Sequence, residues 1–178
     1  MLGALLTTWA IRLALACYAA YLAGWLVSRD PRWSVIARWT WTLGCGLFIA
    51  HVLAAFHFYH HWSHAAAWKT TADETRELLG VEFGDGIYFS YLFTAVWLAD
   101  VISLWASTPP MKTLWTRWLV HGYLLFIAFN GAVVFESGPI RWAGIAACAV
   151  LAILAFWRLY NLKHATTPPT RRPLTSDF

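Results

Sequence analysis

The sequence predicts an all-α fold, a polytopic membrane protein built as a bundle of five transmembrane helices. Of its 178 residues, 60% are hydrophobic and only 12% are charged, whereas soluble domains carry about 25% charged residues. Thirteen tryptophans point the same way, because the indole ring favours the interface between lipid and water. The lipid bilayer is therefore the expected partner. No basic tract is long enough to indicate a nucleic-acid partner.

Five apolar stretches approach or exceed the roughly 20 residues that a helix needs to cross the hydrocarbon core. We expect the spans near residues 5–27, 38–62, 87–107, 115–136 and 140–161, within one domain over residues 1–164. Proline, glycine and serine mark the short connections, and only the second connection, about residues 65–86, is long. Residues 165–178 are rich in proline, threonine and arginine, which predicts a flexible cytoplasmic tail.

The charges of the connections predict the orientation, because lysine and arginine collect in cytoplasmic loops. The first and third connections and the tail are basic, with Arg29, Arg32, Lys112, Lys163, Arg171 and Arg172. The second connection is acidic instead, with Asp73, Glu74, Glu77, Glu82 and Asp85. This alternation predicts an N-terminus outside and a C-terminus in the cytoplasm, with the acidic connection on the outer face.

Four histidines lie within eight residues at the outer end of the second predicted span: His57, His60, His61 and His64. On a continuous helix these positions are i, i+3, i+4 and i+7, so their side chains share one face. Imidazole is the commonest protein metal ligand, and each i,i+4 pair could chelate one ion. We therefore predict an outward-facing site for a transition metal, zinc, copper or iron. The alternative is an interfacial belt of aromatic and histidine side chains.

The acidic connection offers further ligands for such a metal. Residues 70–80 predict a short amphipathic helix that ends at Gly80. Asp73 and Glu77 lie one turn apart on this helix and are the candidate carboxylate partners. A metal with an open coordination position could support redox or hydrolytic chemistry on a membrane-associated substrate. Whether the chain is an enzyme stays open.

Polar residues inside the predicted spans need an explanation, because an ionisable group in the bilayer is costly. Asp100 and His121 enter the third and fourth spans from the same side, which predicts an intramembrane hydrogen-bonded pair. Arg12, near the outer end of the first span, is expected to extend its guanidinium toward the interface.

His51, near the middle of the second span, supports an alternative function. His51 and His121 could be the two ligands of one heme b in an electron-transfer subunit. A further alternative is a non-catalytic structural subunit, in contact with other membrane subunits of a larger complex. The small fraction of the chain outside the predicted spans favours this class, because it leaves little room for a substrate domain.

Two resemblances to known families add to this interpretation. Residues 57–61, H-x-x-H-H, resemble one histidine box of the membrane-bound fatty acid desaturases and hydroxylases. Those enzymes need further boxes, whereas only His121 and His164 lie outside the second span and its end here, so their function is not carried over. Residues 51–64, 84–91 and 97–100 are similar to a group of small uncharacterised multi-span membrane proteins of planctomycete-type bacteria. That similarity implies a bacterial inner membrane and a shared architecture, without an activity.

Overall fold

The computed structural model describes residues 2–28, 30, 32–106 and 114–165. The described chain contains helices and no strand, so the all-α prediction is confirmed. Apart from Ala165, the predicted tail lies outside the described residues, as do Arg29 and Lys112 of the basic connections.

Four of the described helices are long and apolar enough to cross a membrane: α1 (Leu2–Val27), α2 (Trp33–Phe58), α4 (Gly86–Ala106) and α6 (Gly138–Ala165). They correspond to the first, second, third and fifth predicted spans. The fourth is α5 (Leu114–Phe129), which continues into a π-helical turn, η2 (Asn130–Val134), and its apolar stretch Leu119–Val134 is shorter. A helical fold with several helices able to span a membrane is confirmed, whereas the count of five crossings stays a prediction.

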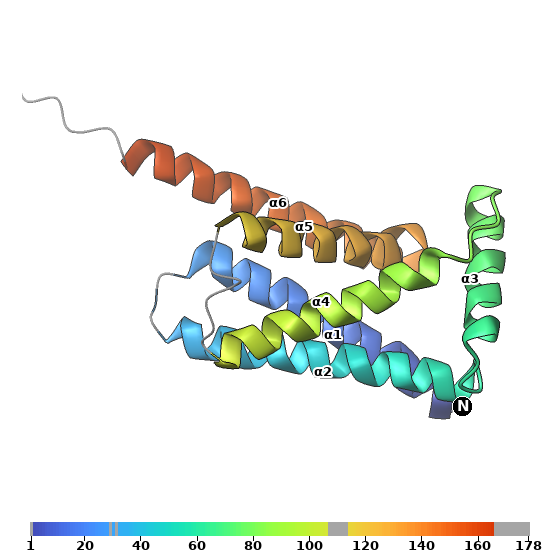
Figure 1. Cartoon of the computed structure of the whole chain (residues 1–178). Coiled ribbons are helices and arrows are strands. Elements are labelled where there is room, and N and C mark those ends of the chain that lie inside the picture. The colour runs from blue at the N-terminus through green and yellow to red at the C-terminus, as the bar shows by residue number, and fades with distance from the viewer. Residues whose placement is uncertain (1, 29, 31, 107–113, 166–178) are drawn as a thin grey trace, which may run out of the picture.

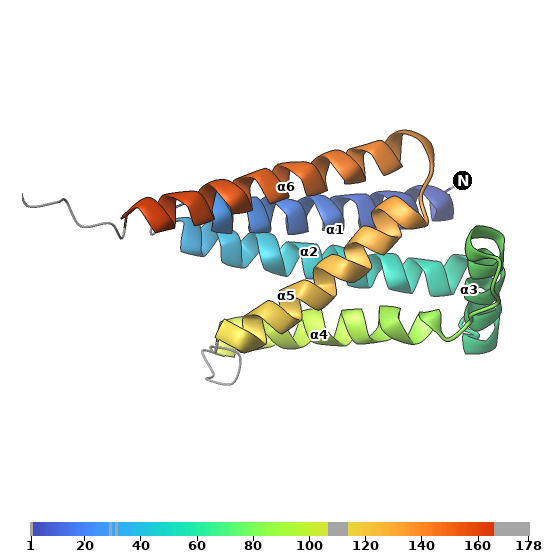
Figure 2. The same cartoon turned by 90° about the horizontal axis from the view of Figure 1, so that it is seen from above.

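The five apolar helices run side by side in alternating directions, as Figure 1 shows. The remaining helix, α3 (His64–Leu79), lies across one end of the bundle near the N-terminus, while α6 ends at the opposite end. Figure 2 shows that α5 runs obliquely, from the end of α4 to the start of α6. Because of this tilt, α5 and α6 meet near the α3 end and separate toward the other end.

The core lies between α1, α2 and α4, with Leu124 of α5 also buried in it, and consists largely of aromatic rings. The Trp41 and Trp97 rings have centroids 4.8 Å apart, and the Tyr18 ring packs against both. Gly44 makes this close packing possible, because an added Cβ would lie 2.9 Å from the Trp97 ring. The Trp41 indole donates a hydrogen bond of 2.9 Å to Asp100 Oδ2, which satisfies the buried N–H inside the bundle.

The chain turns sharply between α2 and α3. Helix α2 ends at Phe58, short of the predicted end at residue 62. His61 and Trp62 have φ values of 47° and 60°, in the left-handed region, and this conformation redirects the chain. Ser63 then caps α3 by accepting a hydrogen bond of 3.2 Å from the backbone N–H three residues on. Gly80 ends α3 with φ 73°, as predicted, but α3 begins earlier than the predicted residue 70.

Candidate functional site

The four clustered histidines do not share one helix face. His57 lies in α2, His60 and His61 lie in the turn, and His64 begins α3. Because the helix ends before His61, the i,i+4 geometry that would let pairs chelate an ion is lost. Among the described residues, no group of three or more His, Cys, Asp or Glu side chains could hold a metal ion. The predicted metal site, and the metalloprotein function built on it, are therefore wrong.

Two of these histidines pack against aromatic neighbours on α2. The His57 ring lies 4.7 Å from the Phe58 ring, and the His60 ring lies 5.6 Å from the Phe56 ring, measured between centroids. Burial lowers the pKa of His60, because an apolar environment disfavours the charged imidazolium. His60 is therefore a packed, neutral side chain at neutral pH.

His64 helps to hold α3 against α4. Its Nδ1 lies 2.9 Å from the Tyr91 hydroxyl oxygen, and its Nε2 lies 3.4 Å from the Tyr88 hydroxyl oxygen. The Trp68 indole of α3 also donates a hydrogen bond of 2.9 Å to Asp85 Oδ1, just before α4. These contacts fix the crosswise position of α3 at the end of the bundle.

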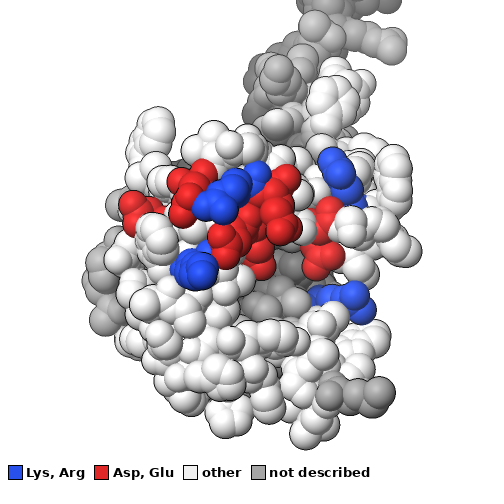
Figure 3. Space-filling model, turned by 90° about the vertical axis from the view of Figure 1, so that its right-hand side faces the viewer, with Lys and Arg blue, Asp and Glu red and all other residues white. Residues whose placement is uncertain are grey.

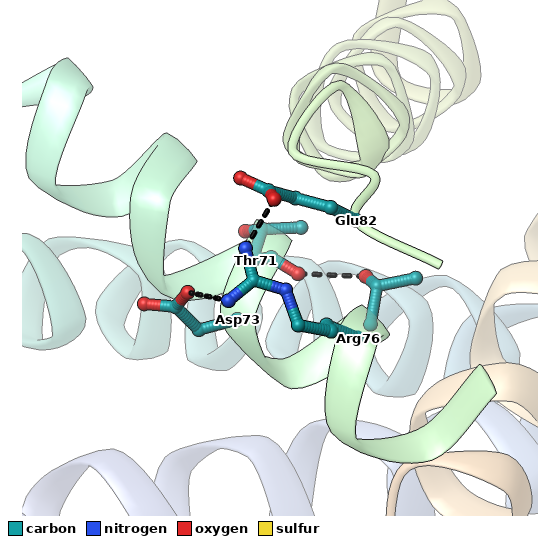
Figure 4. A network of polar contacts seen from close by, with 5 residues as sticks. Thr71, Asp73, Arg76 and Glu82 are labelled. Carbon is teal, nitrogen blue, oxygen red and sulfur yellow. Dashed lines mark hydrogen bonds and ion pairs between the residues drawn. The ribbon is translucent and has the colours of Figure 1, made fainter. Parts of the chain in front are cut away.

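The candidate carboxylates Asp73 and Glu77 both lie on α3, and Asp73 belongs to an ion-pair network there. Arg76 lies 3.7 Å from Asp73 Oδ1 and also pairs with Glu82, as Figure 4 shows. Burial raises the pKa of Glu74, and the nearby charge of Glu77 raises it further. Acidic side chains gather over this end of the molecule, which Figure 3 shows face on. The carboxylates thus form a solvated acidic surface with a central arginine.

The structure does not bring His51 and His121 together. His51 Nδ1 lies 2.9 Å from the Thr7 carbonyl oxygen, whereas the His121 ring packs 5.7 Å from the Tyr21 ring. Thr7 and Tyr21 are fourteen residues apart on α1, which is about 21 Å along a helix axis. A shared heme requires both imidazoles at one iron, and this arrangement does not provide that.

Asp100 and His121 lie in the same neighbourhood around Trp41. The indole of Trp41 donates to Asp100, and the His121 ring stands 5.3 Å from the Trp41 ring. The Tyr18 hydroxyl donates a hydrogen bond of 3.2 Å to the His121 carbonyl oxygen, which ties α5 to α1. The predicted hydrogen bond between the Asp100 and His121 side chains stays a prediction.

A cavity of about 610 Å³ lies between α1, α5 and α6. Apart from His121, its walls are Leu22, Trp25 and Leu26 of α1, Gly122, Leu125, Phe126 and Phe129 of α5, and Cys148, Leu151, Ala152 and Ala155 of α6. A cavity of about 350 Å³ adjoins it and shares several of these walls, including Leu22 and Leu125. We call the two cavities together the lateral groove.

The lateral groove exists because α5 and α6 touch at one end and then diverge. Gly144 of α6 packs so closely on η2 that an added Cβ would lie 2.8 Å from the Ala132 carbonyl oxygen. From there α5 tilts away from α6 (Figure 2), and the small side chains of α6 do not fill the gap. An added Cβ at Gly122 would meet nothing within 4 Å, which places open space beside α5. The side-chain amide of Asn130 donates a hydrogen bond of 2.7 Å to the Phe126 carbonyl oxygen at the start of the π-helical turn.

Charged groups lie near both ends of the lateral groove. Arg12 lines the smaller cavity, with its guanidinium 5.5 Å from the centroid of the Trp9 ring. At the other end the Arg158 guanidinium lies 4.7 Å from the Trp25 ring and donates to the Trp25 carbonyl oxygen. Thirteen residues of α1 separate Arg12 from Trp25, which is about 20 Å. This arrangement can hold an elongated apolar molecule that carries a polar end.

The sequence contains only an indirect signal for this groove. The run of small residues at 143–149, A-G-I-A-A-C-A, and the glycine at 122 mark surfaces without bulky side chains. Small residues usually let membrane helices approach closely, so they predict contact more readily than a gap. The gap depends on the tilt of α5, which no local pattern specifies.

Comparison with known proteins gives no relative for this chain. No family model matches it, and no curated protein or solved structure is significantly similar to it.

Proposed function

We propose that this protein binds a single-chain, lipid-like molecule of the bilayer in the lateral groove. The observation that carries the proposal is the cavity of about 610 Å³, within the range of about 300–1,000 Å³ typical of small-molecule sites. Its almost entirely apolar lining suits an alkyl or isoprenoid chain. Trp25 and Phe126, which line the cavity, are also exposed on the surface, so the chain enters from the side.

The apolar walls give a physical reason for occupation of the groove. Its lining is almost entirely apolar, and it is open on one side. An apolar chain in contact with the walls gains dispersion energy that an unfilled groove lacks.

The proposal includes a membrane topology. The chain crosses the bacterial inner membrane five times, with α5 as the fourth crossing, the N-terminus outside and the C-terminus in the cytoplasm. The alternating helix directions support this topology (Figure 1), and so does the charge distribution. The acidic residues lie at the α3 end, whereas Arg32, Arg38 and Arg158 belong to the opposite ends of their helices, as the preference of basic residues for the cytoplasm requires.

Cysteine labelling tests the topology. In a chain whose three native cysteines are replaced by alanine, Glu77→Cys should react with a membrane-impermeant maleimide in intact cells. Arg32→Cys should react only after lysis. Reaction of both variants in intact cells, or of neither, contradicts the proposed orientation.

Filling the groove from Gly122 tests the binding function. An added side chain at Gly122 points into open space, so Gly122→Leu should fold and occupy the site of the chain. Gly46→Leu is the matched control, because Gly46 is also a helical glycine with open space around it but lies on the exposed face of α2. We expect extraction and mass spectrometry of the purified proteins to find a lipid-like molecule retained by the wild type and the control. Gly122→Leu should lose most of it. Equal retention by all three proteins contradicts the proposal.

A second candidate function is that of a structural subunit in a larger membrane complex. It is favoured by α6, because none of the residues in its apolar stretch Gly138–Asn161 is buried in the chain. A partner helix would cover exposed side chains such as Ile153 and Phe156. A photoreactive amino acid at position 156 should then cross-link to another membrane protein in intact membranes, whereas cross-links to lipid alone contradict this candidate.

A further inference from the structure

Arg12 is a charged side chain well inside an apolar helix. It lies ten residues after the start of α1, which is about 15 Å along the helix axis. Long helical side chains lean toward the N-terminus of their helix, and the guanidinium accordingly lies over the ring of Trp9, one turn earlier. The charge thus sits closer to the N-terminal interface than its Cα atom, but still beside the lateral groove.

The guanidinium of Arg12 has N–H donors without an acceptor among the described residues. An arginine side chain carries five N–H donors, and the Trp9 ring attracts the charge without offering an oxygen acceptor. Among the residues that the structure describes, no oxygen accepts a hydrogen bond from Arg12 and no carboxylate pairs with it. A cation within a membrane span is costly unless it pairs, so this site favours an anion.

Space for such an anion lies next to the guanidinium. Arg12 lines the cavity of about 350 Å³ together with the small side chains of Ala16, Ala143 and Ala147. None of the described residues that line either part of the groove is acidic. A planar guanidinium binds a carboxylate through two parallel hydrogen bonds, which gives both strength and orientation.

The charge balance favours a carboxylate over a phosphate monoester. Of the described residues that line the groove, Arg12 is the one with a permanent charge. A carboxylate carries one negative charge, which Arg12 neutralises. A phosphate monoester carries about −1.5 to −2 at neutral pH, and the excess would stay uncompensated among apolar walls.

The length of the groove favours a long chain. The distance of about 20 Å from Arg12 to Trp25 along α1 exceeds half of the hydrocarbon core, about 15 Å. A chain anchored at Arg12 therefore follows α1 past Leu22 to the wide end of the groove, where the larger cavity lies.

From these observations we infer that the ligand is a long-chain carboxylate, with its anionic end on Arg12 and its alkyl chain along the groove. The inference rests on the proposed lipid-binding function and adds the chemical class of the ligand. Arg12 is a binding residue in this arrangement, and the apolar walls supply the contact with the chain.

The test compares two probes that differ only in the charged end. Equilibrium binding of radiolabelled oleate and oleyl alcohol is measured on the purified full chain in neutral maltoside micelles. We expect the wild type to bind oleate about tenfold more tightly than oleyl alcohol, or more, as for a charge-assisted hydrogen-bonded pair. Arg12→Gln should lower the affinity for oleate to that for the alcohol and leave alcohol binding unchanged, and Arg12→Lys should keep a preference for oleate. Arg141→Gln is the matched control, because Arg141 is an exposed arginine near the start of α6 that does not line the groove. This variant should behave as the wild type.

The possible failures of the two proposals are distinguishable. If the wild type binds oleate and oleyl alcohol equally while Gly122→Leu weakens both, the groove function stands and the role of Arg12 is overturned. If oleyl phosphate binds more tightly than oleate through Arg12, the assignment to a carboxylate is overturned. If neither oleate nor the alcohol binds to the wild type, both proposals fall. The preference measured on the wild type alone keeps the test decisive even if Arg12→Gln does not fold.

Discussion

The hydrogen bond between Trp41 and Asp100 offers a quantitative test of how the core is held together. The indole N–H of α2 donates over 2.9 Å to a carboxylate of α4, and the Trp41 side chain is fully buried. This hydrogen bond can be removed in a double-mutant cycle with Trp41→Phe, which removes the donor, and Asp100→Leu, which removes the acceptor. The cycle isolates the coupling energy of the pair from the cost of lost packing at each position.

Two known ranges bound the expected coupling energy. Hydrogen bonds to charged groups contribute about 1.5–3 kcal/mol in soluble proteins. Interhelical hydrogen bonds in membranes average about 0.6 kcal/mol and reach about 1.7 kcal/mol, because the unfolded chain in the membrane also finds partners. Since the acceptor here is an aspartate side-chain oxygen and the donor is enclosed by the rings of Tyr18, Tyr21 and Trp97, we expect a value where the two ranges overlap, about 1.5 kcal/mol.

The assay is reversible unfolding of the four proteins of the cycle in mixed micelles with increasing denaturing detergent. The pair of Trp105 and Thr42 is the control, because its indole also donates over 2.9 Å, but to a neutral hydroxyl at an exposed position. The cycle of Trp105→Phe with Thr42→Val should give only about 0.6 kcal/mol. A coupling energy for Trp41 and Asp100 within about 0.3–0.5 kcal/mol of zero, the scatter of independent sites, would show that this hydrogen bond does not help to hold α2 against α4.

Three further predictions follow from local geometry. Gly44→Ala should lower the free energy of unfolding by about 1–3 kcal/mol, because the new Cβ overlaps the Trp97 ring. Gly46→Ala is the control, because its Cβ lies in open space, and it should leave the free energy of unfolding unchanged or raise it. Detergent unfolding of both variants checks this prediction. Gly80→Ala should cost about 1–2 kcal/mol at the end of α3, because φ is 73° there, and amide hydrogen exchange over the last turn of α3 should become faster with no change in the core. Burial keeps the pKa of His60 in the folded turn below the ordinary value of about 6.5, so the unfolded turn binds more protons. The folded turn therefore loses stability as the pH falls through about 6.5. Faster hydrogen exchange in residues 59–63 at the lower pH checks the sign, and a His60→Phe variant that responds in the same way contradicts the assignment.

The long helices could be predicted because length and composition are enough to define them. The third predicted span, 87–107, corresponds closely to α4, and the first, 5–27, differs from α1 only at its start. Apolar residues that must lie in lipid leave few alternatives to a helix, since every backbone group needs an internal partner there. Gly80 also ends α3 as predicted, because a glycine with positive φ is a common end of a helix.

The sequence predicted a histidine site and not the lateral groove, because two structural features that decide between them have no local signature. The spacing of the four histidines predicts one face of a continuous helix, and residues 57–64 contain neither glycine nor proline to mark a break. The break comes from positive φ at His61 and Trp62, which is uncommon for residues other than glycine. The lateral groove arises from the tilt of α5 against α6, and such angles are set by packing over the whole bundle.

The structure gives α1 two different roles, and they explain how a rigid core and an open groove coexist in one small bundle. Ala14 is buried in the aromatic core, Tyr18 is buried there and also borders the smaller cavity, and Arg12 and Leu22 line the groove. The core fixes α1 as one wall of the groove, and the hydrogen bond from Tyr18 to the His121 carbonyl oxygen sets the distance to α5. The opposite wall is α6, none of whose described side chains is buried, so filling the groove displaces no core contact. Changes in the core should therefore alter stability, whereas changes on the groove side of α5 should alter ligand retention at nearly constant stability.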